Sequence, residues 1–389
     1  MPKKMPLGSK INKFPPYLFK ELDRKKKEAE KKGRKIISLA VGDPDIATPA
    51  PIVRFAAKEV LKKSNHSYPY SKGSAKLRKS ISSWHKRRYK TKLNPDTEVL
   101  ALIGSKEGIA HLPFVVLNKG DTAIICNPSY PPYKTGVLLS DAKVARVPLK
   151  EENGFLPDLD AIDVKLLKKT KLFFLNYPNN PTGAVANKKF YAKIIQLAKK
   201  YSFWIAQDAA YSEIYFNKPP LSILEIPGAS DVAVEFHSVS KTFCMTGWRM
   251  AWVVGNKDII RELAKLKENM DSGQFNAVQE TAAYALDNYE KFVPSLRKIF
   301  YERRKKFAAV LQEEGWSVYP SEASFFIWAR PPVNISSIKC VYKMLDSAEV
   351  LATPGSGFGS CGEGYVRFSL TARDSLLVKA ARKIKKIKW

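Results

Sequence analysis

Short apolar runs alternate with amphipathic segments through the first two thirds of the chain. Runs rich in Val, Ile, Leu and Phe precede stretches with helical spacing, as in VLALIG then SKEGIAHLPFVVL, or KLFFLNYP then KKFYAKIIQLAKKY. This alternation is typical of an α/β protein with a doubly wound, mostly parallel sheet. The expected strands are residues 99–104, 122–128, 142–149, 171–178, 203–210, 232–240 and 250–255. Ligands of such sheets bind at the carboxyl ends of the strands, so residues just after each run are candidates for a site.

The two ends of the chain follow other patterns. The segment IISLAVGDPD, residues 36–45, predicts a short strand leading into a turn, and helical spacing follows over residues 50–63. One long helical stretch is expected over residues 257–312, and it would bridge two domains. Beyond it, WSVYP, SFFIWAR and GYVRFSL predict strands around a helical segment, followed by a basic terminal helix. These elements are typical of a smaller α+β domain.

Chain length agrees with two domains. A chain of 389 residues is too long for one ordinary hydrophobic core. We expect a large domain over residues 46–290 that carries the parallel sheet. Residues 1–45, as an N-terminal arm, and residues 291–389 would together form the small domain.

Composition argues against several classes of protein. No apolar run approaches the roughly 20 residues that cross a bilayer, and the N-terminus lacks the apolar stretch of a secretory signal, so we expect a soluble, cytoplasmic protein without a membrane partner. Cys126, Cys244, Cys340 and Cys361 lie far apart without a CxxC pair, and the four histidines form no HExxH pairing. Free thiols and the absence of a metal site are therefore expected.

The formal net charge of +29 raises the question of nucleic-acid binding. About half of the excess lies at the ends, since residues 1–35 hold 13 Lys and Arg against 4 Asp and Glu, and residues 373–389 hold 7 against 1. No zinc-finger, winged-helix or RNA-binding signature accompanies the charge. We interpret it as a generally basic surface that attracts anionic substrates and cofactors, and we expect no nucleic-acid partner.

Lys241 is the strongest candidate for chemistry. The segment SVSKTFCMTGWR, residues 238–249, follows the strand VAVEFH, which places Lys241 on the loop beyond a strand end. A lone Lys is usually a solvated surface charge. Among these apolar and hydroxyl residues, however, partial burial would lower its pKa and free the amine to attack an aldehyde. Arg249 is suitably spaced to bind a phosphate that Ser238 also contacts.

Two more candidate segments follow strand ends. In isolation, Asp208 and Tyr211 of DAAY indicate a helix cap and a packed aromatic residue. A buried carboxylate is also what a pyridine nitrogen needs to stay protonated, which makes the ring an electron sink, and a phenol three residues later can reach the ring's other side. Asn180 lies in the turn-forming sequence NYPNNPTG, yet its amide can donate to a ring hydroxyl. The bond between Asn180 and Pro181 is a candidate cis peptide bond.

Three further candidates each have a purely structural alternative. The GSKEG loop, residues 104–108, stands between a strand and a helix, where backbone amides and the helix dipole bind phosphate, although such loops are common. Tyr130, in PSYPPY, can stack on a planar cofactor or serve as a turn aromatic. Arg367, in YVRFSL, can hold a substrate α-carboxylate with its guanidinium fork, or form a surface salt bridge.

The order of these features is more specific than any one of them. It runs Gly42, Tyr68, Gly104, Ser105, Lys106, Tyr130, Asn180-Pro-Thr-Gly183, Asp208, Tyr211, Ser238, Lys241, Arg249 and Arg367. Through NNPTG, DxxY, SxSK with its following Arg, and the late Arg, the chain resembles the class I/II aminotransferases of fold type I over about residues 35–370. The resemblance implies that the large domain binds pyridoxal 5′-phosphate. It also implies a homodimer with active sites at the subunit interface.

The resemblance further implies a role for each residue. Lys241 would hold the cofactor as a Schiff base and then move a proton between the substrate Cα and the cofactor C4′. Asp208 would pair with the ring nitrogen, and Arg367 would hold the α-carboxylate while the backbone near Gly42 closes over it. The other implied contacts are Asn180 and Tyr211 on the ring oxygen, Tyr130 stacked on the ring, Ser105, Lys106, Ser238 and Arg249 around the phosphate, and Tyr68 on the phosphate of the neighbouring subunit.

Other functions of the same fold stay open at this point. A lyase or decarboxylase would keep Lys241 and Asp208, and it differs in whether a keto acid regenerates the cofactor. A cofactor-binding transcription regulator would need a winged-helix domain, whereas only about 35 residues precede the first expected strand. An aminotransferase is favoured because the residues that would hold the cofactor are all present, together with Arg367 for the substrate carboxylate. Tyr130 stands where many aspartate enzymes have Trp, which leaves the side-chain preference open.

A closer resemblance predicts the substrate. GSKEGIAH and NMDSGQFNAVQE are similar to segments of the LL-diaminopimelate aminotransferases of the class I/II group, which use 2-oxoglutarate. That donor carries an ammonium and a carboxylate at its far end, for which Glu107 and Asn276 are candidates by position, acting across the dimer interface. A helix-capping Glu107 and a packed Asn276 are the structural alternatives. Lys106 would instead hold the distal carboxylate of aspartate or glutamate, and alanine is another alternative donor.

Overall fold

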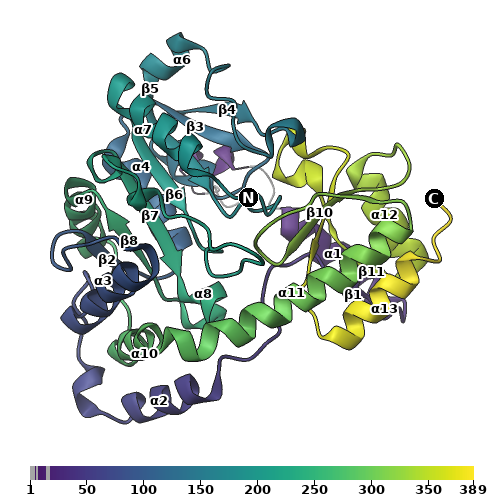
Figure 1. Cartoon of the computed structure of the whole chain (residues 1–389), viewed down its shortest axis with the longest axis horizontal. Helices are drawn as coiled ribbons and strands as arrows, with labels where there is room; N and C mark the ends of the chain where they lie inside the picture. The colour runs from purple at the N-terminus through teal and green to yellow at the C-terminus, as the bar shows by residue number, and fades with distance from the viewer. Residues whose placement is uncertain (1–4, 6–7, 15–17) are drawn as a thin grey trace.

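A seven-stranded sheet forms the centre of the computed structural model, which describes residues 5, 8–14 and 18–389 (Figure 1). In spatial order its strands are β2 (Val99–Leu102), β8 (Ala251–Gly255), β7 (Ala233–Ser238), β6 (Trp204–Asp208), β5 (Thr170–Asn176), β3 (Thr122–Asn127) and β4 (Lys143–Pro148). Strand β8 runs antiparallel to both of its neighbours, and the other pairs are parallel. The predicted doubly wound, mostly parallel sheet is confirmed.

Both faces of this sheet are buried. Along β8, Ala251 and Val253 belong to one hydrophobic core, whereas Trp252 and Val254 belong to another. Strands buried on both faces are apolar almost throughout, which is why they stand out as continuous runs in the sequence. The surrounding helices are α2 (Ala50–Val60), α3 (Ala75–Tyr89), α4 (Ser105–Val116), α5 (Tyr133–Leu139), α6 (Val164–Lys169), α7 (Lys188–Tyr201), α8 (Val239–Thr242), α9 (Lys257–Glu268) and α10 (Asn276–Asp287).

The prediction of a single long helix over residues 257–312 is wrong. Three helices occupy this stretch: α9, α10 and α11 (Tyr289–Glu313). The first break contains Gly273, whose φ of +89° lies in the left-handed region, and the Asp271 carboxylate accepts from its N–H. The second break is at Asn288, whose φ of −110° and ψ of 23° are not helical. The spacing of apolar residues on either side was typical of a helix, and it did not reveal these breaks.

Of these three helices, α11 is the one that connects the two parts of the molecule. In Figure 1 it is the long green helix that runs from α10 toward α13. Phe292 and Val293, near its start, pack in the core against β2 and β8, whereas Phe300 and Leu311 pack in the core of the C-terminal part. The predicted bridge between two parts is therefore present, although it begins at residue 289 rather than 257.

The C-terminal part is built on a four-stranded antiparallel sheet. Its strands, in order, are β12 (Thr353–Pro354), β13 (Val366–Ser369), β10 (Phe326–Arg330) and β9 (Ser317–Val318). The helices α1 (Leu18–Lys31), α12 (Ser337–Ala348) and α13 (Asp374–Ile384) accompany it. Leu22, Ile37 and Leu39 join its core, so the N-terminal segment packs here although it is distant in sequence.

The strand expected in residues 36–45 is shorter than predicted. Only β1 (Ile37–Ser38) is regular, and it pairs in parallel with β11 (Val350–Leu351). The Leu39 carbonyl then accepts from the Ser369 N–H. The short 3-10 helices are η1 (Ser9–Lys13), η2 (Lys63–His66), η3 (Glu151–Asn153), η4 (Ile223–Glu225), η5 (Ala229–Asp231), η6 (Thr246–Trp248), η7 (Gly355–Phe358) and η8 (Ser360–Gly362). Within the described part of the chain, no helix is long and apolar enough to span a membrane.

Candidate active site

A cavity of about 310 Å³ lies where the ends of β5, β6 and β7 meet the C-terminal sheet and the segment after β1. Its lining residues are Val41, Gly42, Ser105, Tyr130, Tyr133, Asn176, Asn180, Asp208, Ala210, Tyr211, Lys241, Phe326 and Arg367. A second hollow of about 430 Å³ is lined by Val41, Asp43, Ser105, Lys106, Tyr130, Ala210, Ser238, Ser240, Lys241, Thr246, Gly247 and Arg249. The two hollows form one continuous site, because they share the lining residues Val41, Ser105, Tyr130, Ala210 and Lys241.

Lys241 stands at the junction of the two hollows. It lies on the single turn α8, where the Ser238 hydroxyl accepts from the Ser240 N–H at 3.1 Å. The Lys241 Nζ donates to the carbonyl of Gly42 at 2.6 Å. Burial lowers the pKa of Lys241 to about 8, so a substantial fraction of the amine is neutral near physiological pH. A neutral amine is the form that attacks a carbonyl carbon.

Asp208 ends β6 and is buried, with 6% of its surface exposed. Its two carboxylate oxygens accept hydrogen bonds from different donors, the Tyr133 hydroxyl at 2.8 Å and the Ala210 N–H at 3.1 Å. Burial raises the pKa of Asp208, because a charge is poorly solvated there. Tyr133 was not among the predicted site residues. Its position in PSYPPY, three residues after the candidate Tyr130 and close behind a strand end, is the signal that would have found it.

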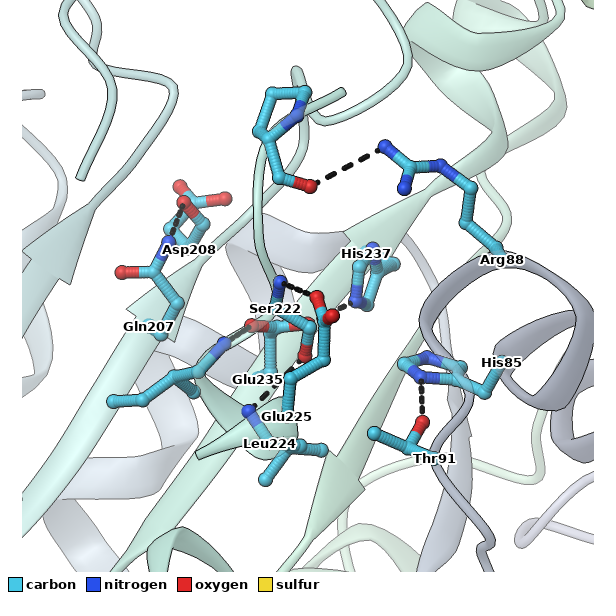
Figure 2. A network of polar contacts seen from close by, with 12 residues as sticks. His85, Arg88, Thr91, Gln207, Asp208, Ser222, Leu224, Glu225, Glu235 and His237 are labelled. Atoms are coloured by element: carbon cyan, nitrogen blue, oxygen red, sulfur yellow. Dashed lines mark hydrogen bonds and ion pairs between the residues drawn. The ribbon is translucent and has the colours of Figure 1, made fainter. Parts of the chain in front are cut away.

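A polar network on the opposite face of β6 and β7 supports this strand end (Figure 2). Because side chains alternate along a strand, Gln207 points away from the face that carries Asp208. The Gln207 amide donates to the Tyr177 carbonyl at 2.6 Å. The buried Glu235 carboxylate accepts from the Ser222 hydroxyl at 2.7 Å, and its Oε1 lies 2.7 Å from His237 Nε2. These contacts satisfy the buried polar groups beneath the strand end that carries Asp208.

Arg367 and Asn180 meet on the side of the cavity formed by the C-terminal sheet. Arg367 lies on β13, is 2% exposed, and donates from Nη1 to Asn180 Oδ1 at 2.8 Å. Its Nη2 donates to the Ala40 carbonyl, and the Phe326 ring lies 4.1 Å from the guanidinium carbon. The peptide bond between Asn180 and Pro181 is cis, which confirms that prediction. A buried guanidinium in this position can bind a carboxylate with two parallel hydrogen bonds.

The second hollow has the features of an anion site. Ser105 and Lys106 begin the 12-residue helix α4 and line this hollow, and the start of a helix has backbone amides free to bind an anion. Gly104 has φ of +84°, and a Cβ added there would lie 2.2 Å from Arg249 Nη2. Glycine therefore lets the Arg249 guanidinium pack against this loop. Ser238 lines the same hollow, so the structure brings together the four residues predicted for a phosphate.

Three predicted site residues lie outside the lining of both hollows. Tyr68 follows η2 and is 90% exposed. Glu107 Oε1 lies 3.0 Å from His111 Nδ1, and Glu107 Oε2 accepts from the Ile103 N–H at 2.8 Å. The Asn276 amide donates to the Ser67 carbonyl at 3.1 Å. Within this chain, Glu107 stabilises the start of α4, and Asn276 holds the loop that carries Tyr68.

A family model and the sequences of known relatives agree on one protein family for this chain. Residues 34–384 match the family model described as aminotransferase class I and II. The LL-diaminopimelate aminotransferase of Aquifex aeolicus is 48% identical over 383 residues, covering 98% of this chain and 99% of that protein. That of Oleidesulfovibrio alaskensis is 46% identical, covering 97% and 98%.

Solved structures agree over nearly the whole chain. The apo-BacF structure from Bacillus subtilis has a TM-score of 0.95 and 38% identity, with 99% of both chains covered. The structure of an aminotransferase from Staphylococcus aureus has a TM-score of 0.91 and 32% identity, with 98% of both chains covered. The family resemblance predicted from the motifs is thus confirmed, and the chain belongs to the class I and II aminotransferases.

Proposed function

We propose that this aminotransferase uses pyridoxal 5′-phosphate attached to Lys241, and that it moves an amino group from LL-diaminopimelate to 2-oxoglutarate. The observation that carries the cofactor assignment is the meeting of Lys241, Asp208 and Arg249 along one continuous site. An amine of lowered pKa, a buried carboxylate and an anion site are what an aldehyde, a pyridine nitrogen and a phosphate each need. The residues present therefore fit this cofactor.

In this proposal, different residues of the chain bind different parts of the cofactor. When bound, the cofactor would supply an electron sink for negative charge that develops at the substrate Cα. Asp208 holds the proton on the ring nitrogen, Tyr130 stacks on the ring, and Lys241 moves the proton at Cα. Asn180 and Tyr211 hydrogen-bond the ring oxygen, while Ser105, Lys106, Ser238 and Arg249 bind the phosphate. The lining of the two hollows supports these assignments.

Arg367 is proposed to bind the α-carboxylate of the substrate, with the backbone at Gly42 closing over it. A Cβ added at Gly42 would lie 2.8 Å from the Phe326 ring, so glycine allows the segment to approach the cavity wall closely. The contacts of Arg367 with Asn180 and Phe326 fix the plane of its guanidinium. A fixed fork loses little freedom when it binds a carboxylate.

The variant Arg367→Lys is expected to raise the KM for the amino acid about 10- to 100-fold with a smaller change in kcat. An ammonium cannot form two parallel hydrogen bonds, and losing one charged hydrogen bond costs about 1.5–3 kcal/mol. Steady-state kinetics with varied amino donor measure the effect. Arg304→Lys is the matched control, because Arg304 binds Ser321 and Tyr319 outside the cavity lining. An unchanged KM for Arg367→Lys would make Arg367 a purely structural residue.

A homodimer with shared sites is also part of the proposal. Tyr68, Tyr70 and Leu61 are exposed by 90%, 83% and 84%, and large side chains so exposed favour a partner surface. Tyr68 would reach the phosphate in the neighbouring subunit. Asn276 anchors the Tyr68 loop, so it would approach that same neighbouring site. We propose that Asn276 and Glu107 recognise the distal end of the donor there.

The division into two domains belongs to this proposal as well. Residues 46–290 would form the cofactor-binding domain, and residues 1–45 with 291–389 the smaller one. The hydrophobic cores change over between Val293 and Leu296 in α11, which supports a boundary within the first turns of this helix, a few residues beyond 290. Residues 1–4, 6–7 and 15–17 of the N-terminal arm lie outside the described part of the chain.

The donor is tested by comparing specificity constants for LL-diaminopimelate, aspartate and alanine with 2-oxoglutarate as acceptor. LL-diaminopimelate is expected to have a kcat/KM at least about 10-fold above the others, because its distal ammonium and carboxylate would add at least one charge-assisted hydrogen bond. The relatives' names support this donor. A preference for aspartate would indicate that Lys106 holds a distal carboxylate instead. A preference for alanine would equally refute diaminopimelate while leaving amino transfer intact.

A further inference from the structure

We propose that Tyr133 is a positioning residue, which keeps the Asp208 carboxylate ionised and oriented toward the ring nitrogen of the cofactor. This inference rests on the function proposed above and deepens it. The observation that carries it is the contact between two buried side chains, the Tyr133 hydroxyl and Asp208 Oδ2, at 2.8 Å.

The ring of Tyr133 is held on two sides. It stacks on Phe174, with ring centroids 5.4 Å apart and planes inclined by 12°. It meets Tyr130 nearly edge-on, with centroids 5.6 Å apart and planes at 80°. Tyr133 is also the first residue of α5, so its backbone is part of a regular element. The hydroxyl is therefore held in place before any cofactor binds.

Asp208 needs such a donor because its surroundings disfavour charge. Its other oxygen accepts from the Ala210 N–H, so the two contacts together fix the plane of the carboxylate. A phenol donates a hydrogen bond without bringing a positive charge, unlike Lys or Arg. The carboxylate consequently keeps its full negative charge for a protonated ring nitrogen, in a low dielectric where that attraction is strong.

Tyr133 can serve only as a donor here. Burial raises the pKa of its hydroxyl well above 10, and the neighbouring Asp208 charge raises it further. The phenol thus keeps its proton throughout the pH range in which the enzyme would work. A donor that never ionises cannot repel the carboxylate it supports.

The first test is a pH titration of Asp208 in the apoenzyme. The titration is monitored by NMR of protein labelled with 13C at the aspartate carboxyl carbons. The Asp208 signal is assigned with Asp208→Asn. In Tyr133→Phe the pKa of Asp208 is expected to rise by about one to two units, because a hydrogen bond to the charged form is lost. Tyr319→Phe is the control, since it removes a tyrosine hydroxyl bond to the Gly154 carbonyl away from the cavity. An unchanged titration in Tyr133→Phe would overturn the inference and leave the proposed function standing.

The second test uses the loaded enzyme. The acid limb of the pH profile of kcat/KM is expected to move to higher pH in Tyr133→Phe and not in Tyr319→Phe. In the Asp208→Asn background, Tyr133→Phe is expected to cause no further loss of kcat/KM, because both act through one carboxylate. If the losses of kcat/KM from the two substitutions multiplied in the double variant, Tyr133 would act by packing alone. The same conclusion would follow if the acid limb of Tyr133→Phe equalled that of the wild type. If Lys241→Ala still transferred amino groups, the proposed function itself would fail, which is a separate outcome.

Discussion

Replacing Lys241 by alanine is expected to abolish amino transfer, with kcat reduced by more than about 10⁴-fold. Two losses combine: the amine that binds the cofactor aldehyde, and the group that moves the proton at the substrate Cα. The lining of the continuous site contains Lys106 as its other lysine, but that residue belongs to the phosphate end. The visible absorption of the lysine-bound cofactor should disappear from the spectrum. Turnover should be lost in both single-turnover and steady-state assays.

Lys134→Ala is the matched control for this variant. Burial lowers the pKa of Lys134 as it does that of Lys241, but Lys134 is not among the lining residues of either hollow. Its replacement should leave both the absorption and the kcat near the wild-type values. A Lys241→Ala enzyme that cycled at a rate near wild type would require another nucleophile and would remove the basis of the cofactor assignment.

The Asp208→Asn variant is expected to bind the cofactor but to slow proton abstraction about 10²- to 10³-fold, the usual cost of losing a preorganised electrostatic contact. An amide can hydrogen-bond a ring nitrogen, but it has no charge with which to keep that nitrogen protonated. The single-turnover rate of the loaded enzyme, followed with α-deuterated donor, measures this step directly. A normal rate with a normal isotope effect would rule out that Asp208 is needed to keep the ring nitrogen protonated.

Asp163→Asn provides the control for that substitution. Asp163 caps α6 by accepting from the Lys165 N–H at 2.8 Å, and asparagine caps helices as well as aspartate does. The same chemical change far from the cavity should therefore leave the single-turnover rate unaltered. Thermal unfolding of both variants then separates a loss of chemistry from a loss of fold.

The sequence by itself determined the strands and the residues that follow them. Apart from the edge strand β4, the strands of the large sheet are buried almost throughout, so their mostly apolar runs end at polar residues such as Asn176, Asp208 and Ser238. Parallel strands bring these ends to one edge of the sheet, which is why residues scattered over the chain were expected to converge. The same reasoning explains the prediction of Lys241 just beyond β7.

Tertiary structure decided what local patterns do not encode. The breaks at residues 269–275 and at Asn288 divide a stretch that was predicted as one helix, and the contact of Tyr133 with Asp208 joins residues 75 positions apart. Glu107 followed a strand end as the site residues did, yet its carboxylate pairs with His111 on its own helix. A strand end determines where a residue lies along the sheet edge. Only packing of the neighbouring helices determines whether its side chain turns into the cavity or away from it.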